Sequence, residues 1–226
     1  MNFATWEPVY GAILADLGFD RTGDERARDV LVDLAEPFET DRLAGIEGAT
    51  VAVAGAGPSL PGELDLAAEA DYVIAASTAA DVLMEAGIDP DLFVTDVDKN
   101  PETLRGLTER GVPAAVHAHG DNVGLIERWM PRLAGENVLP TTQAAPKGPV
   151  KNFGGFTDGD RGAFLADHFG AARLAFPGWD LDDPSVGPMK ARKLRWAERL
   201  LRWLETRRDE RFPVLDGRRD GIDPVY

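Results

Sequence analysis

From residue 49 onward, short apolar runs alternate with stretches of helical periodicity. This alternation constrains the fold more than any other feature. The runs are spaced about 20 residues apart, which is typical of β-α units that build a mostly parallel sheet with helices on both faces. Alanine and valine dominate them, as expected for strands buried on both sides. We therefore predict an α/β fold with a mostly parallel, Rossmann-like sheet. The predicted strands are Thr50–Ala54, Tyr72–Ala76, Leu92–Thr95, Ala114–His117, Val138–Thr141 and Leu174–Phe176.

The first part of the chain follows a different pattern. Apolar side chains recur there at helical spacing in two successive segments, which predicts two helices. We therefore divide the chain into an N-terminal helical extension, 1–48, and an α/β domain, 49–226. Two segments stand out within that domain. A long helix is predicted over 188–208, and a loop rich in Gly and Pro covers 143–160. A loop of this length is typical of a functional segment.

Composition excludes several classes of function. The chain has no cysteine, which excludes disulfides, cysteine-ligated zinc and thiol catalysis. Its net charge is −15, and only five of its 24 basic residues are lysines. Halophilic proteins have this composition, whereas a nucleic acid partner requires a basic face. No apolar run approaches the roughly 20 residues of a membrane span, and the N-terminus lacks signal-peptide features. We expect a cytoplasmic protein without nucleic acid or membrane partners, either a monomer or a homo-oligomer.

Ligands of open α/β sheets bind at the carboxyl ends of the strands, so residues there are the first candidates for a site. After the first strand, Gly55, Gly57 and Ser59 are predicted to offer backbone N–H groups to a phosphate. The alternative is a tight turn that binds nothing. No acidic residue occurs at 76–78, after the second strand. A ribose contact for a dinucleotide or S-adenosylmethionine is therefore unsupported.

The third predicted strand ends with two carboxylates, Asp96 and Asp98. Side chains two residues apart can face the same side and share a hard cation with phosphate oxygens. Without a cation, carboxylates directly after an apolar strand would repel each other. We predict that both aspartates bind magnesium (Mg²⁺) and act in catalysis. A surface turn without function is the alternative.

The fourth strand leads into two histidines, His117 and His119, followed by Asp121 and Asn122. Two of the three histidines in the chain fall at this strand end, which suggests a metal or substrate site. No third soft ligand is evident, so contacts with substrate or phosphate are favoured over zinc. Asp121 and Asn122 are assigned to ligand binding, and capping of the next helix is the alternative.

The loop rich in Gly and Pro contains Asn152 and a glycine pair, Gly154 and Gly155. Paired glycines allow the backbone to approach a ligand closely, so these three residues are predicted to contact one. Asp158, Asp160 and Arg161 follow, and their side chains can also orient a ligand. For Asp160, capping of the next helix is the alternative.

The final strand and helix complete the set of candidates. Asp180 follows the sixth strand and is predicted to be a third carboxylate of the cleft. The only dense basic cluster of the chain opens the last predicted helix. Its Lys190 and Lys193 are three residues apart and so share one helical face. We predict that they neutralise a triphosphate and that Lys190 acts in catalysis. A solvated surface is the alternative.

Six motifs, taken in order, resemble those of a known family: GAGPSL, PDLFVTDVDKNPE, HAHGDN, NFGGFTDGDRG, GWDL and PMKARKL. Together they are similar to the archaeal MptE-like 6-hydroxymethyl-7,8-dihydropterin pyrophosphokinases. The resemblance implies ATP as co-substrate, Mg²⁺, and a dihydropterin alcohol as acceptor. The implied products are AMP and a pterin diphosphate for folate or methanopterin coenzymes. The strand that carries the aspartates also resembles that of thiamin pyrophosphokinases. However, Lys99-Asn100-Pro101 follows it where those enzymes typically place a serine.

The residues fit this chemistry independently of the resemblance. Diphosphate transfer depends mainly on positioning and on neutralisation of charge, which carboxylate-bound Mg²⁺, backbone N–H groups and lysines supply. Other readings stay open. One is a thiamin pyrophosphokinase-like diphosphotransferase, and another is a nucleotide-sugar or S-adenosylmethionine-dependent transferase on the same fold. The last is a nucleotide-binding protein without catalysis.

Overall fold

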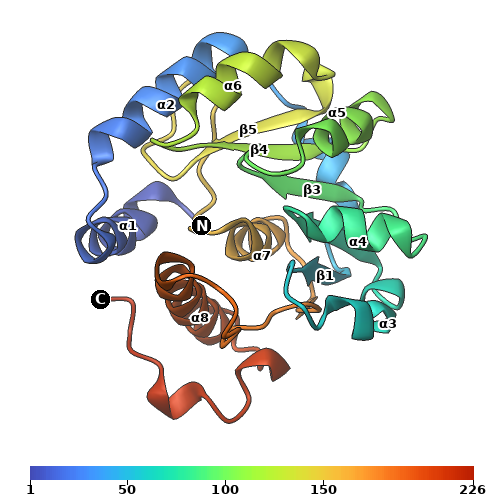
Figure 1. Ribbon diagram of the computed structural model, residues 1–226, viewed down its shortest axis with the longest axis vertical. Helices are drawn as coiled ribbons and strands as arrows, with labels where there is room; N and C mark the ends of the chain where they lie inside the picture. The colour runs from blue at the N-terminus through green and yellow to red at the C-terminus, as the bar shows by residue number, and fades with distance from the viewer.

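The computed structural model describes residues 1–226 and contains one six-stranded sheet. All neighbouring strands pair in parallel, in the order β5-β4-β3-β2-β1-β6. Helices cover both faces (Figure 1). The predicted α/β fold with a parallel sheet is therefore confirmed. The strands are β1 (Thr50–Ala54), β2 (Tyr72–Ala76), β3 (Leu92–Thr95), β4 (Ala114–Ala118), β5 (Val138–Thr142) and β6 (Arg173–Ala175).

The first three strands have the predicted bounds, and β4 and β5 are each one residue longer than predicted. The prediction for the last strand was shifted by one residue. β6 lies at the edge of the sheet and pairs only with β1, where Arg173 is opposite Thr50. Beyond Ala175 the chain turns, and the Pro177 carbonyl accepts the N–H of Gly55. This turn brings the segments after β1 and β6 together.

Alternate side chains of the strands belong to two separate cores. In β1, Val51 and Val53 pack on one face of the sheet, and Ala52 and Ala54 on the other. The helices divide between the two faces in the same way (Figure 1). The first layer contains α1 (Phe3–Leu17), α7 (Asp158–His168) and α8 (Pro188–Arg208). The second contains α2 (Arg21–Leu34), α3 (Leu64–Ala68), α4 (Ala79–Glu85), α5 (Pro101–Glu109) and α6 (Val123–Trp129).

The two predicted N-terminal helices are present, and they lie on opposite faces of the sheet. α1 ends at Gly18, whose left-handed conformation (φ 75°) turns the chain, and Asp20 then caps α2 through the N–H of Thr22. The chain thus crosses from one layer to the other within a few residues. That 49–226 is a domain of its own stays a prediction. None of the helices is both long and apolar enough to cross a membrane.

Candidate active site

A cavity of about 520 Å³ lies at the carboxyl ends of the strands. It is lined by residues at the ends of all six strands, by the first turn of α7 and by the N-terminal part of α8. Because β3 lies in the interior of the sheet, Asp96 and Asp98 have strand ends on both sides of them. The corner between α1 and α2 also lines the cavity, through Phe19 and Asp20. The N-terminal helices therefore belong to this site, which the sequence analysis did not foresee.

Asp96 and Asp98 both line the cavity because the residue between them adopts an unusual backbone conformation. Val97 has a φ of 69° and is 1% exposed. Its N–H donates to the hydroxyl of Thr95 at 3.0 Å. A left-handed conformation is strained for a β-branched residue, and such strain is typically found at functional sites. The turn buries the valine and leaves both carboxylates at the cavity.

The two carboxyl groups have opposite pKa shifts. Burial by itself would raise the pKa of Asp96. Hydrogen bonds with His119 and Asp98 and the charge of Arg161 outweigh burial and hold this pKa well below its usual range. Burial, followed by the hydrogen bond and charge of Asp96, raises the pKa of Asp98 to about 6. Near neutral pH the pair therefore holds two mutually repelling negative charges, which a divalent cation would relieve.

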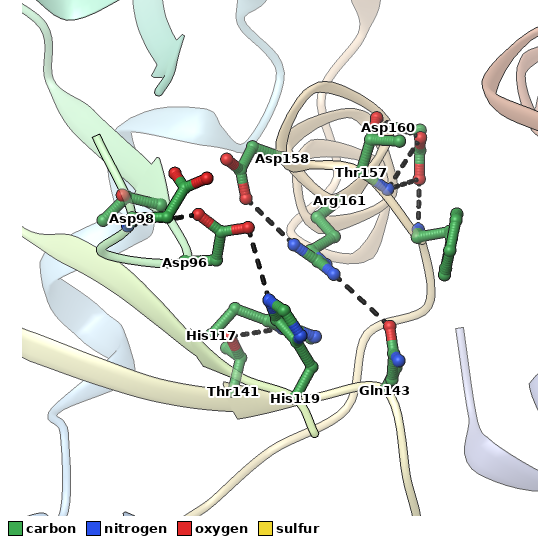
Figure 2. A network of polar contacts seen from close by, with 12 residues as sticks. Asp96, Asp98, His117, His119, Thr141, Gln143, Thr157, Asp158, Asp160 and Arg161 are labelled. Carbon is green, nitrogen blue, oxygen red and sulfur yellow. Dashed lines mark hydrogen bonds and ion pairs between the residues drawn. The ribbon is translucent and has the colours of Figure 1, made fainter. Parts of the chain in front are cut away.

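A further carboxylate of the cavity, Asp158, comes from the first turn of α7, in the segment whose polar side chains were predicted to orient a ligand. Figure 2 shows it between the Asp96–Asp98 pair and Arg161, whose Nη1 donates to Asp158 Oδ1 at 2.9 Å. Burial, and then the charge of Asp96, raises the pKa of Asp158 to about 7 despite the nearby arginine. A repulsive carboxylate cluster of this kind marks a functional site more often than a structural one.

Asp160 shares the same turn but has a purely structural set of partners. It is fully buried and accepts the N–H groups of Phe156 and Thr157 and the Thr157 hydroxyl, which completes a capping box. The alternative of helix capping weighed for Asp160 is therefore confirmed. The cap fixes the first turn of α7, and with it the positions of Asp158 and Arg161.

Arg161, in the same segment that was predicted to orient a ligand, is the least exposed of the four cations that line the cavity. It is 8% exposed. Its Nη2 donates to Gln143 Oε1 at 3.3 Å, and its buried Nε has no partner in the protein. An arginine fixed on two sides, with a donor left free, is well suited to bind an anionic group of a ligand.

Three lysines also line the cavity: Lys99, Lys190 and Lys193. Desolvation of the ammonium group by the surrounding protein, and then the charge of Lys99, lower the pKa of Lys190. Part of its side chain is nevertheless exposed to solvent. Lys193 Nζ lies 5.7 Å from the ring centre of Phe19 and 5.8 Å from that of Phe156. The other two cations of the basic cluster do not line the cavity: Arg192 pairs with Asp16, and Arg195 is exposed.

The glycine-rich segment after β1 uses its N–H groups within the protein. Gly55 donates to the Pro177 carbonyl, Gly57 to the Gly178 carbonyl, and Ser59 to Asp180 Oδ2 at 2.8 Å. A Cβ atom on Gly57 would lie 2.3 Å from the same Asp180 oxygen. The glycines are thus explained by close packing against the segment after β6. Gly55, Gly57 and Asp180 line the cavity, whereas Ser59 does not.

Several other predicted binding residues have structural partners. The Asn122 side chain joins strand ends by donating to the carbonyls of Asp96 and His117, and the Asn152 side chain donates to the carbonyls of Gln143 and Ala144. Neither asparagine lines the cavity, nor does the glycine pair at 154–155, whereas Asp121 does. Gly155 has a φ of 88°, and a Cβ atom there would lie 2.5 Å from the Arg161 backbone.

The two histidines differ in environment. His117 is 2% exposed, its Nδ1 lies 3.1 Å from the Thr141 hydroxyl, and burial lowers its pKa well below the usual value. It is therefore a neutral residue behind the site. His119 lines the cavity, and its Nε2 lies 3.4 Å from Asp96 Oδ2 (Figure 2). The ring thus orients the Asp96 carboxylate.

The donor set can be compared with what Mg²⁺ requires. No group of three or more His, Cys, Asp or Glu side chains is arranged to hold a metal ion by itself. Mg²⁺, however, is usually held by one or two carboxylates together with substrate phosphates and water. The repelling Asp96–Asp98 pair, whose Asp98 has a raised pKa, supplies this partial set. The residues present therefore fit a Mg²⁺ ion that binds together with a phosphorylated ligand.

The fold and the cavity define a Rossmann-like α/β protein with carboxylates and cations gathered at its strand ends. By sequence, the chain belongs to the MptE-like 6-hydroxymethylpterin diphosphokinase family, which it matches over residues 28–185. It is 37% identical to a protein of Methanothermobacter thermautotrophicus and 33% identical to one of Methanocaldococcus jannaschii. In each comparison 94% of this chain and 99% of the relative are covered. A protein of Pyrococcus furiosus is 35% identical, with 91% and 95% covered. All three are named 6-hydroxymethyl-7,8-dihydropterin pyrophosphokinase.

Proposed function

We propose that this chain transfers a diphosphate from ATP to the hydroxymethyl group of 6-hydroxymethyl-7,8-dihydropterin in a Mg²⁺-dependent reaction. The products are AMP and the pterin diphosphate. The names of the three archaeal relatives support the substrate. The observation that carries the chemistry is the cluster of Asp96, Asp98 and Asp158 beside three lysines and an arginine, in a cavity that eight aspartates line in all. This is the charge pattern that phosphoryl transfer requires.

Asp96 and Asp98 are the residues that would hold Mg²⁺. A Mg²⁺ ion held there would neutralise negative charge on the phosphates and on the departing AMP. Burial, and then the hydrogen bond and charge of Asp96, raise the pKa of Asp98, and a bound cation would relieve the repulsion between the two carboxylates. His119 keeps the Asp96 carboxylate oriented from the other side.

The cations are assigned to the triphosphate. The N–H groups of Gly55, Gly57 and Ser59 are occupied, so Lys190, Lys193 and Arg161 are the better phosphate contacts. The hydroxymethyl oxygen attacks the β-phosphorus, forming the new O–P bond. The bond from the β-phosphorus to the oxygen shared with the α-phosphate breaks, and AMP leaves with that oxygen. The hydroxyl proton passes to a cavity carboxylate or to water.

The reaction is tested by incubating the purified protein with ATP, Mg²⁺ and 6-hydroxymethyl-7,8-dihydropterin and by measuring AMP. We expect AMP release that requires the pterin and is abolished by EDTA. Asp96→Asn should lower turnover by orders of magnitude, because a cation ligand is lost. Parallel reactions with thiamin and with S-adenosylmethionine test the two alternative hypotheses, a thiamin pyrophosphokinase-like enzyme and an S-adenosylmethionine-dependent transferase. AMP release with thiamin but not with the pterin would overturn the proposal, as would ATP binding without any AMP.

A further inference from the structure

Asp24 is a buried carboxylate on α2 that lines the cavity and lies far in sequence from the strand-end residues of the site. It is 4% exposed, and its side chain accepts three hydrogen bonds. Oδ2 accepts from the Tyr10 hydroxyl at 2.6 Å and from Gln143 Nε2 at 2.7 Å. Oδ1 accepts from the backbone N–H of Gly120 at 2.8 Å. Burying a carboxylate costs free energy unless it is fully hydrogen-bonded, and this one is held by three separate segments.

One branch of the network leads from Asp24 to Arg161. Gln143 donates its Nε2 to Asp24, and its Oε1 accepts from Arg161 Nη2 at 3.3 Å. Figure 2 shows Gln143 and Asp158 holding the Arg161 guanidinium from two sides. The backbone carbonyl of Gln143 accepts hydrogen bonds from Trp6 Nε1 and from the Asn152 side chain. The backbone of Gln143 is therefore held in place, and Asp24 and Arg161 hold its side-chain amide.

Asp24 determines which way the Gln143 amide points. A carboxylate can only accept hydrogen bonds, so Gln143 must turn its NH₂ group toward Asp24. Its oxygen is then left to accept from Arg161, which can only donate. If the amide turned over, its NH₂ group would face the guanidinium, and two donors would meet. The acceptor that holds Arg161 thus exists because of a carboxylate on α2.

The second branch leads from Asp24 to the segment after β4. Gly120, whose N–H binds Asp24, is adjacent to His119, and His119 lies against Asp96. The backbones at Gly23 and Gly120 also approach closely, because a Cβ atom on either glycine would lie 3.2 Å from the other residue. One side chain therefore holds the segments that follow two neighbouring strands, β4 and β5.

We propose that Asp24 is a positioning residue of the active site, which holds Arg161 through Gln143 and holds His119 through Gly120. The inference rests on the proposed function for its kinetic consequence. By this inference the N-terminal helices contribute to catalysis. The reason is that α2 supplies the carboxylate that positions His119 after β4, Gln143 after β5 and Arg161 on α7. Arg161 contacts the ligand, and Asp24 acts through it.

The test begins with Asp24→Asn, which keeps the shape of the side chain. The introduced amide has an acceptor at only one end, so it can satisfy either Gln143 or Gly120 but not both in their native orientations. We expect kcat to fall roughly 10- to 100-fold, the range for catalytic groups displaced by about 1 Å. KM for ATP and pterin should change little. Asp33→Asn, an exposed position on the same helix, is the matched control and should leave kcat unchanged.

A compensating double variant separates positioning from general loss of packing. In Asp24→Asn with Gln143→Glu, the new amide donates to the new carboxylate, which again accepts from Arg161. Gln143→Glu alone sets two buried carboxylates against each other and should be the worst of the three variants. We expect the double variant to regain most of the kcat lost by Asp24→Asn. A second readout independent of turnover is the Nε–H NMR signal of the Arg161 side chain. It should shift or broaden in Asp24→Asn and return in the double variant.

The outcomes are decisive in either direction. Recovery of kcat and of the Arg161 signal in the double variant supports the proposal. A wild-type kcat in Asp24→Asn overturns it, and so does a folded double variant with no recovery of either readout. If Asp24→Asn does not fold, Gln143→Ala cuts the same link, and a wild-type kcat there also overturns the proposal. A wild-type protein that releases no AMP refutes the proposed function instead, and the NMR comparison still tests the positioning of Arg161.

Discussion

At the residue scale, Asp98 is where stability and function are expected to conflict. Its pKa is raised to about 6, so the folded state binds this proton more tightly than the unfolded state does. The resulting loss of stability is absent below about pH 4 and grows as the pH rises through 6. Asp98→Asn removes the charge. Without Mg²⁺, we expect the variant to melt above wild type at pH 7.5 and close to it at pH 4.

The same substitution should severely reduce diphosphate transfer, because half of the proposed Mg²⁺ site is lost. Thermal melts with and without Mg²⁺ and ATP, next to AMP assays, measure both effects. Wild-type turnover in Asp98→Asn would remove this residue from the site. A lower melting temperature at pH 7.5 would show that the carboxylate stabilises the fold, contrary to its pKa shift.

Lys190 and Lys193 give a second prediction at this scale. Both line the cavity one helical turn apart, and each would contribute a charge-assisted hydrogen bond to the triphosphate. Changing either to alanine should lower kcat/KM for ATP about 10- to 100-fold, with a smaller effect on pterin binding. Arg195→Ala is the matched control, because it is exposed on the same helix outside the cavity. Wild-type ATP kinetics in all three variants would show that the two lysines are solvated surface residues without a role in ATP binding.

At the element scale, the ring of Trp179 packs against Gly159 in the first turn of α7 and fixes where this helix starts. Trp179, after β6, donates its Nε1 to the carbonyl of Val53 at 2.8 Å. Its ring lies where a side chain on Gly159 or Gly55 would otherwise be. A Cβ atom on Gly159 would lie 2.7 Å from the ring. Because Asp158 and Arg161 are on the same turn of α7, this contact links helix position to the site.

Gly159→Ala tests that link. The added methyl group must displace the ring or the helix turn, at a cost of about 1–3 kcal/mol. Catalysis should fall further than this loss of stability explains, because the turn carries two cavity residues. Gly106→Ala in α5 is the control, since no atom lies within 4 Å of its added Cβ. It should be neutral or stabilise by up to about 1 kcal/mol. If Gly159→Ala keeps wild-type stability and activity, the contact between Trp179 and Gly159 does not fix the position of α7.

At the scale of the whole molecule, the net charge of −15 predicts a strong dependence of stability on salt. Many ion pairs of the surface, such as Arg21–Glu7 and Arg110–Asp89, are exposed and contribute little. The general repulsion among carboxylates should therefore dominate. We expect the melting temperature to rise from low salt to molar KCl, as screening shortens the range of repulsion. Sucrose, which stabilises without screening, is the control. A flat or falling curve in KCl would show that the acidity is not a salt adaptation.

The sequence by itself determined the α/β class, the strand bounds to within one residue, and the presence of Asp96, Asp98, Lys190 and Lys193 at the strand-end cavity. These follow from local periodicity and from the rule that parallel strands end at one edge. Only the tertiary structure decided which neighbouring residue faces the ligand. It places Asp158 in the cavity and Asp160 in a cap, and it engages Ser59 with Asp180. It also joins Asp24 to Gln143. The capping box of Asp160 is a local contact. The contacts of Ser59 with Asp180 and of Asp24 with Gln143 join residues 121 and 119 positions apart, and no local pattern contains such distances.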